Sequence, residues 1–294
     1  MMHLLKNDLL ELEIDLPDEG YRFSRFDWSG KITKVKFKGV DVSTKERTDN
    51  VNEHDFGKGL YNEFGIDNAL GYEDAVVGDW FHKIGVGLLK KDDKTYAFHK
   101  SYEIHPLAYK IHQSPKGITL ECESELINGY GYILQKEITL FEAHFKISYR
   151  LDNTGQKPLV TDEYIHNFVA LDNELIGSNY ILRFPFELKP ERFNDYVNPD
   201  NKIIIGGKEI TFRGGHEEQF FFSNVSGNTS VDAKWELVNL KSKIKISEEG
   251  SFKTNKINLW GWQHVVCPEL FYHIHLEAGQ STEWERTYRF ESLE

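Results

Sequence analysis

The sequence has little cysteine, no long apolar run and no excess of positive charge. Its two cysteines, Cys122 and Cys267, lie far apart and form no CxxC pattern, so we expect buried reduced thiols rather than a disulfide or a thiolate metal site. No segment reaches the roughly 20 apolar residues that a transmembrane helix needs. Polar residues between Asn7 and Glu13 interrupt the apolar stretch that a secretory signal would require. We therefore expect a cytoplasmic protein that does not enter a membrane.

Acidic residues outnumber basic ones, 47 to 35, which gives a formal net charge of −12 over 294 residues. A net negative chain repels nucleic acid and anionic membrane surfaces, so neither is an expected partner. Hydrophobic residues make up 39% of the chain and aromatic residues 14%, which is enough for a sizeable core. Aromatic side chains suit both strands and sugar-binding clefts. Composition leaves the ligand and the oligomeric state open.

Alternation of apolar and polar residues recurs along the chain in short runs that end at Gly, Asn, Asp or Pro, which is typical of strands. We find no internal repeat and no long amphipathic helix. The pattern predicts an all-β protein, a large antiparallel β-sandwich that forms a single domain over residues 1–294. The expected strands include 30–39, 96–110, 117–126, 132–140, 143–152, 179–188, 203–205, 218–223, 233–239 and 243–247.

The segment 57–87 differs from these runs because it is rich in glycine and shows no sustained periodicity. Such a long irregular segment is either a binding loop or a structural crossover between two sheets. Its glycines do not form GxGxxG, so no phosphate loop and no nucleotide cofactor are expected. As a binding loop it offers four polar side chains, those of Glu63, Asp74, His82 and Lys83.

Residues 143–152 alternate as a strand with one buried face, and a turn begins at Asn153. In the strand that follows, His166 shares one face with Tyr164 and Phe168. A lone histidine among aromatic residues is usually a hydrogen-bonded core residue. On a rigid strand beside a cleft, it can also serve as an acid or base.

Near the C-terminal end, alternation over 270–276 and 283–290 with a turn at Gly279 predicts a β-hairpin, with Glu269 at the start of its first strand. Trp260 and Trp262 lie just before this segment. They either form a platform on which a sugar stacks or pack in the core.

Two of these segments resemble the galactose mutarotase (aldose 1-epimerase) superfamily. One is the strand ending in Asp152-Asn153-Thr154-Gly155 with the following His166-Asn167-Phe168. The other is Val266-Cys267-x-Glu269 before a strand, a glycine turn and a W-x-x-x-Y-x-F pattern, which is similar to the hexose-6-phosphate epimerase branch. The resemblance implies a galactose mutarotase-like supersandwich and a small-molecule sugar as partner. It also implies His166 as general acid and Glu269 as general base.

The superfamily's Asn-Arg and Leu-His-Gly-Gly sugar-binding segments have no counterpart here, and segment 57–87 occupies their place. Its four polar side chains and the two tryptophans are therefore the candidate sugar-binding residues. Cationic side chains could bind a sugar phosphate or a uronate carboxylate, or be ordinary surface charges. These are Lys83, Arg183 and Arg213.

Interconversion of the two anomers of an aldose needs one base for the C1 hydroxyl proton and one acid for the ring oxygen. Each positioned proton transfer contributes about 10²–10⁴-fold in rate. Neither a metal nor another cofactor is required. His273 and His275 share a strand face but would need a third ligand to hold a metal, so we expect none.

The leading interpretation is an isomerase of carbohydrate metabolism, a sugar 1-epimerase that uses His166 and Glu269. The alternative is a non-catalytic carbohydrate-binding protein on the same scaffold. A lyase or hydrolase of acidic sugars is a third possibility. Convergence of the two side chains within the width of one sugar ring would favour the epimerase.

Overall fold

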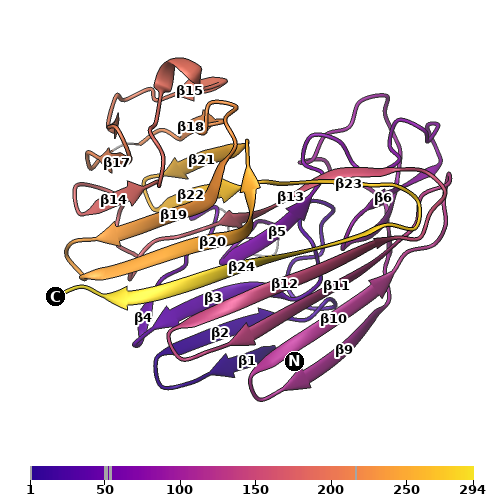
Figure 1. The fold of residues 1–294 in the computed structure, drawn as a ribbon, viewed down its shortest axis with the longest axis horizontal. Helices are drawn as coiled ribbons and strands as arrows, with labels where there is room; N and C mark the ends of the chain where they lie inside the picture. Colours follow the sequence, from indigo (N-terminus) through magenta and orange to yellow (C-terminus); the bar gives the residue numbers. More distant parts are fainter. Residues whose placement is uncertain (1, 50–51, 53–54, 216) are drawn as a thin grey trace.

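The computed structural model describes all residues except 1, 50–51, 53–54 and 216. The regular secondary structure of the described residues consists of antiparallel strands and one 3₁₀ turn, η1 (Pro190–Arg192). Figure 1 shows large curved sheets packed against each other. The predicted all-β antiparallel sandwich is therefore confirmed. None of the described residues lies in a helix long and apolar enough to cross a bilayer.

The first large sheet has seven strands in the order β1-β2-β3-β5-β13-β23, with β4 paired to β3. The bounds are β1 (His3–Lys6), β2 (Leu10–Asp15), β3 (Lys31–Phe37), β4 (Val40–Asp41), β5 (Leu60–Phe64), β13 (Leu159–Asn167) and β23 (Tyr272–Leu276).

The second large sheet has ten strands in the order β16-β17-β14-β19-β20-β24-β12-β11-β10-β9. The bounds are β9 (Tyr109–Ser114), β10 (Gly117–Glu123), β11 (Tyr132–Leu140), β12 (His144–Asn153), β14 (Tyr180–Arg183), β16 (Ile203–Ile205), β17 (Glu209–Phe212), β19 (Val231–Asn239), β20 (Ile244–Thr254) and β24 (Ser281–Ser292).

Two smaller sheets lie toward opposite ends of the molecule in Figure 1. One has four strands in the order β15-β18-β21-β22, and the other has three in the order β6-β7-β8. The bounds are β15 (Asp195–Val197), β18 (Phe220–Ser223), β21 (Ile257–Trp262), β22 (Val265–Leu270), β6 (Trp80–Lys83), β7 (Gly87–Lys90) and β8 (Ile104–Pro106).

The hydrophobic core fills the space between the two large sheets. Phe37 on β3 meets Phe290 on β24 with ring centroids 5.8 Å apart, and Phe64 on β5 meets Trp284 on β24 at 6.2 Å. Every second side chain of β12 and β24 is buried along most of their length, as the alternation predicts. One apolar cluster runs from Leu5 to Phe290. The single domain over 1–294 stays a prediction.

Both connections highlighted by the sequence run between the large sheets. The turn after β12 leads from the ten-stranded sheet to β13 in the seven-stranded sheet, and the turn at Gly279 leads back from β23 to β24. The two connections are held together by Asn153, whose Nδ2 donates to the carbonyls of Lys157 and Leu276, both at 2.9 Å. The predicted C-terminal hairpin is therefore wrong: β23 pairs with β13, and β24 pairs with β12 and β20.

Other predicted boundaries also differ from the structure. Within the expected strand 96–110, only β8 and the first two residues of β9 are strand, and within 179–188 only β14 is, because the remaining residues lie in loops. Segment 57–87 is less irregular than predicted, since it contains β5, β6 and the first residue of β7. Glu269 does not start a strand but is the fifth residue of β22. Both cysteines are buried and unbonded.

Three fully buried charged side chains connect the two large sheets. Arg286 on β24 places Nη2 2.7 Å from Oε2 of Glu163 on β13, and Nη1 2.5 Å from Oε1 of Glu248 on β20. The indole nitrogens of Trp284 and Trp235 donate to Glu163 and Glu248 at 3.0 and 2.7 Å. We call Glu163, Glu248 and Arg286 the inter-sheet ion cluster.

Candidate active site

The candidate site is a cavity of about 870 Å³ beside the four-stranded sheet. Its wall is formed by β13, by that sheet and by loops near Arg25, Glu46 and Phe98. Charged and imidazole side chains at the cavity are those of Arg25, Glu46, Arg47, Asp67, His99, His166, Asp195, Lys256 and Glu269.

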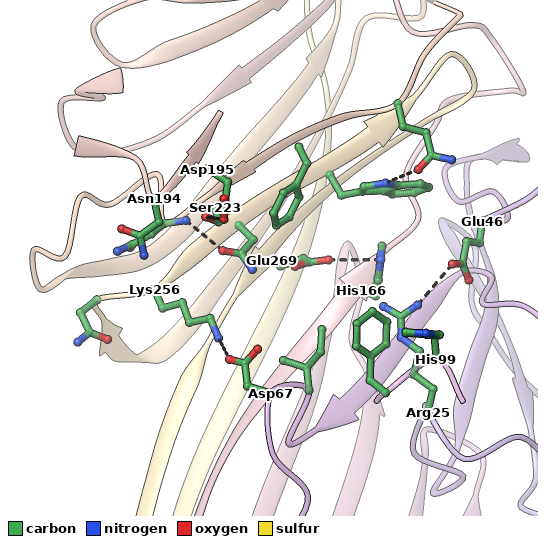
Figure 2. A pocket seen from close by; sticks show the side chains of 18 of the residues that line it. Arg25, Glu46, Asp67, His99, His166, Asn194, Asp195, Ser223, Lys256 and Glu269 are labelled. Atoms are coloured by element: carbon green, nitrogen blue, oxygen red, sulfur yellow. Dashed lines mark hydrogen bonds and ion pairs between the residues drawn. The ribbon is translucent and has the colours of Figure 1, made fainter. Parts of the chain in front are cut away.

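His166 and Glu269 meet in the middle of this cavity (Figure 2). An antiparallel bridge between Val169 and Val266 fixes the register of the chain after β13 against β22. Continued by three residues in each direction, this register places His166 opposite Glu269. His166 Nε2 lies 3.3 Å from Glu269 Oε1, and each residue is only 4% exposed. The topology therefore brings together two side chains that are 103 positions apart in the sequence (269 − 166).

The backbone on both sides of Glu269 is held by buried side chains. Asn167 Nδ2 donates to the carbonyl of Pro268 at 2.6 Å, and Arg286 Nη2 donates to the carbonyl of Leu270 at 2.8 Å. On the other side of the pair, the His166 ring stacks on Phe168 with centroids 4.2 Å apart. These contacts restrict the positions of both side chains.

Burial shifts the pKa values of this pair in opposite directions. The pKa of Glu269 rises to about 8, mainly because burial disfavours the carboxylate, although Arg25 opposes the shift. The pKa of His166 falls well below its ordinary value, because burial and then the Arg25 charge disfavour the imidazolium. Near neutral pH the pair therefore carries one proton.

Arg25 is the main cation near the pair, and it was not predicted from the sequence. Its Nε donates to Glu63 Oε2 at 3.0 Å, and its guanidinium lies over the Phe26 and Phe98 rings at 4.5 and 4.7 Å. It comes from the irregular stretch between β2 and β3, where no periodic pattern identifies it.

The predicted sugar-binding residues separate into three groups. Trp260 lines the cavity, with its ring 5.5 Å from that of His166. Glu63 and Lys83 lie behind the cavity wall as a buried ion pair, with Lys83 Nζ 3.1 Å from Glu63 Oε1. The remaining three residues lie elsewhere and do not line this cavity: Asp74, His82 and Trp262.

The contacts of these three residues account for their positions. Asp74 is exposed and forms an ion pair with Lys157 at 2.8 Å. His82 is buried with Nε2 3.2 Å from the Tyr130 carbonyl, and burial lowers its pKa to about 4. The Trp262 indole donates to the Glu217 carbonyl at 2.6 Å. Segment 57–87 instead contributes its Ile66 and Asp67 to the cavity.

The structure also places the other candidate cations and the two histidines, His273 and His275, at which no metal site was expected. Arg183 forms an exposed ion pair with Glu209, and neither it nor Arg213 lines the cavity. His273 and His275 are both exposed on β23. Within the described part of the chain, no three His, Cys, Asp or Glu side chains are grouped so that they could hold a metal ion.

Several lining residues were missed by the sequence interpretation. They are mostly amides in loops and on the four-stranded sheet, and a possible signal was the concentration of asparagine between 194 and 258. They include Asn194, Asn224, Asn228, Asn255, Lys256 and Asn258.

Comparisons with known proteins identify the fold. No protein-family model and no curated protein sequence matches the chain. Solved structures do match over nearly all of it. Slr1438 from Synechocystis sp. PCC 6803 is 13% identical with a TM-score of 0.61, covering 99% of this chain and 96% of that one. A galactose mutarotase-like protein from Lactobacillus casei ATCC 334 is 12% identical with a TM-score of 0.59, covering 99% and 100%.

A third similar structure is a protein from Escherichia coli K12 provisionally described as an aldose 1-epimerase. It is 11% identical, with a TM-score of 0.60, and covers 100% of this chain and 99% of that one. At these identities the likeness concerns the fold. The chain has the galactose mutarotase-like β-sandwich fold, as the sequence resemblance implied.

Proposed function

We propose that the protein is a sugar 1-epimerase that interconverts the anomers of an aldose. The observation that carries this proposal is the 3.3 Å approach of His166 Nε2 to Glu269 Oε1 inside a cavity. The C1 hydroxyl oxygen and the ring oxygen of an aldose are bonded to the same carbon. Two proton-transfer groups that are close neighbours can therefore address both oxygens of one ring.

In the proposed reaction, Glu269 removes the proton of the C1 hydroxyl while His166 delivers a proton to the ring oxygen. The C1–ring oxygen bond breaks, and an open-chain aldehyde forms. Rotation about the C1–C2 bond presents the other face of the carbonyl. Closure with the proton transfers reversed gives the other anomer and restores the pair.

The reaction conserves the single proton that the pair carries near neutral pH. In the free protein this proton resides on Glu269, because the pKa of that carboxyl is raised and that of His166 is lowered. For the assigned roles it must pass to His166 when the sugar binds, over the short distance that separates them. The catalytic state is thus the singly protonated pair.

Anomer exchange measured by NMR tests the proposal, using a panel of neutral, acidic and phosphorylated aldoses. We expect exchange above the buffer rate that is lost in both His166→Ala and Glu269→Gln, while Asp74→Asn, outside the cavity, retains it. Circular dichroism and thermal unfolding establish that each variant is folded. Wild-type protein that leaves the buffer rate unchanged for every sugar contradicts the proposal.

The alternative, a non-catalytic carbohydrate-binding protein, is favoured by one observation. His166 Nδ1 is buried and has no hydrogen-bond partner in the described structure. An imidazolium would carry a proton on this nitrogen without an acceptor, which is costly in a buried site. Sugar binding without exchange, seen by calorimetry and NMR on the same protein, would support this alternative.

A further inference from the structure

The cavity extends well beyond the acid–base pair. Its volume of about 870 Å³ lies near the upper end of the roughly 300–1,000 Å³ that is usual for small-molecule sites. In Figure 2, Asn194, Asp195 and Ser223 lie on the Glu269 side of the pair, while Arg25, Glu46 and His99 lie on the His166 side. One pyranose ring bound at the pair therefore leaves much of the cavity unfilled.

The part of the cavity on the Glu269 side has a continuous wall, formed by one face of the four-stranded sheet. Glu269 on β22 is opposite Asn258 on β21, and Trp260 on β21 is opposite Phe221 on β18. Asp195 on β15 is opposite Ser223. All six side chains line the cavity.

The length of this wall exceeds that of one sugar ring. From β22 to β15 there are three strand spacings, which amount to roughly 14 Å. A single pyranose ring covers little more than one of these spacings. The wall beyond Trp260 therefore offers a place for a second ring.

The chemistry of this wall suits an uncharged sugar. Phe221 and Trp260 are cross-strand neighbours and present aromatic surface, while Asn258 and Ser223 add groups that both donate and accept hydrogen bonds. The nearby Lys256 is already neutralised, since its Nζ lies 2.7 Å from Asp67 and 3.3 Å from Asp162. Asp195, which accepts from Ser223 Oγ at 2.6 Å, would repel an anionic ring.

We propose that the substrate is a neutral reducing oligosaccharide of two or more sugar rings. Its reducing-end ring is at His166 and Glu269, and its second ring lies on Phe221 and Ser223. This inference rests on the proposed epimerase function for the role of the reducing end. The second-ring site itself depends only on the wall of the four-stranded sheet.

The test compares monosaccharides with disaccharides in wild-type protein and two variants. The sugars tested for exchange are glucose, galactose, maltose, cellobiose and lactose. For each sugar, kcat/KM of anomer exchange is measured by NMR. We expect kcat/KM for at least one disaccharide to exceed that for the monosaccharide that forms its reducing end. Phe221→Ala should lower that disaccharide's value about three- to tenfold, because an aromatic contact is lost. It should leave the monosaccharide value within twofold.

Tyr196→Ala is the matched control. Tyr196 is an aromatic residue of the same sheet that is half-exposed, on β15, and does not line the cavity. This variant should leave the preference for the disaccharide unchanged. Equal or lower values for every disaccharide, or an equal effect of Phe221→Ala on both sugar sizes, would overturn the inference while leaving the epimerase proposal intact.

Methyl glycosides separate the two proposals, because a sugar methylated at its C1 oxygen can bind but cannot change anomer. Calorimetry with methyl maltoside, methyl cellobioside and methyl glucoside measures the second-ring site without catalysis. Tighter binding of a disaccharide glycoside than of methyl glucoside, weakened by Phe221→Ala, supports the site even if no exchange occurs. No preference for the disaccharide glycosides counts against it.

Discussion

Two groups of buried ionisable side chains in this molecule look alike but have different surroundings. In the inter-sheet ion cluster, Arg286 lies between Glu163 and Glu248, all three have close partners, and none of them lines the cavity of the candidate site. In the other group, Glu269 faces His166 across 3.3 Å at the wall of a large cavity. Arginine keeps its proton at any ordinary pH, whereas histidine releases or binds one near neutrality.

The difference shows how the same fold uses buried ionisable groups for two purposes. Despite burial, Glu163 and Glu248 raise the pKa of Arg286, so its charge is permanent. In the His166–Glu269 pair, burial moves the two pKa values so that a single proton is shared. A permanent charge suits a structural connection between sheets, and a shared proton suits acid–base chemistry. The following predictions test this distinction, beginning with the largest expected effect.

Arg286→Met should remove the structural connection. Two carboxylates would remain buried without a cation, which typically costs about 3–5 kcal/mol. We expect the free energy of unfolding, measured by urea denaturation, to fall by this amount. Arg183→Met, which breaks an exposed pair with Glu209, is the control and should change it by less than about 1 kcal/mol. A similar, small loss in both variants would mean that the cluster does not stabilise the sandwich.

Glu269→Gln should remove the chemistry and preserve the fold. The amide has nearly the same shape as the carboxyl group but cannot act as a base. We expect the anomer exchange rate to fall by about 10²–10⁴-fold, with no loss of unfolding free energy at neutral pH. The exposed Glu209→Gln should retain the wild-type rate. Retention of activity by Glu269→Gln would place the base elsewhere.

The same variant should be more stable than the wild type in alkaline solution. The folded-state pKa of Glu269, about 8, lies above that of an unfolded glutamate. Below the unfolded value the group stabilises the fold fully, and this contribution decreases as pH rises until it is lost above about 8. Urea unfolding at pH 5, 7 and 9 should therefore show a growing advantage for Glu269→Gln. A constant difference across this range would exclude a raised pKa for Glu269.

The exchange rate should depend on pH. Ionisation of Glu269 should set the alkaline end of the active pH range. Above about pH 8 the pair loses its only proton, so the rate should fall toward tenfold for each further pH unit. At low pH a second proton binds, and the rate should fall there too, below the ordinary histidine pKa. NMR exchange from pH 4 to 10 measures both limits. A rate that rises steadily through pH 9 would contradict the shared-proton state.

Asp74→Asn should have the smallest effect of all. Its carboxylate forms an exposed ion pair with Lys157 outside the cavity. We expect a change in unfolding free energy of about 0–1 kcal/mol and an unchanged exchange rate. Thermal unfolding and NMR exchange provide the comparison. A tenfold loss of exchange would return Asp74 to the set of sugar-binding residues.

The sequence was sufficient for the fold class and for the two residues of the proposed acid–base pair. His166 and Glu269 were found by resemblance, since periodicity alone does not relate β13 to β22. The inter-sheet ion cluster leaves a signal in the sequence. Arg286 has the same strand parity as the buried Trp284 and Tyr288, so it was a charged residue on an apolar face.

Local sequence patterns do not predict the other features. Arg25 comes from a loop, and its contact with Glu63 depends on how two distant segments pack. The C-terminal hairpin was predicted because adjacent strands usually pair, but here the chain changes sheets at Gly279. The length of the cavity wall depends on the order of β22, β21, β18 and β15, which no local sequence pattern specifies.

The position of β24 has a consequence for the way the chain reaches its native state. This strand, the last of the described chain, lies in the interior of the ten-stranded sheet between β20 and β12 (Figure 1). During synthesis the sheet must remain divided until residue 292 has left the ribosome. Folding dominated by such distant pairings is slow, and the unpaired edges of β12 and β20 are exposed to aggregation meanwhile. We therefore expect nascent chains that stop before Ser281 to depend on chaperones for their solubility.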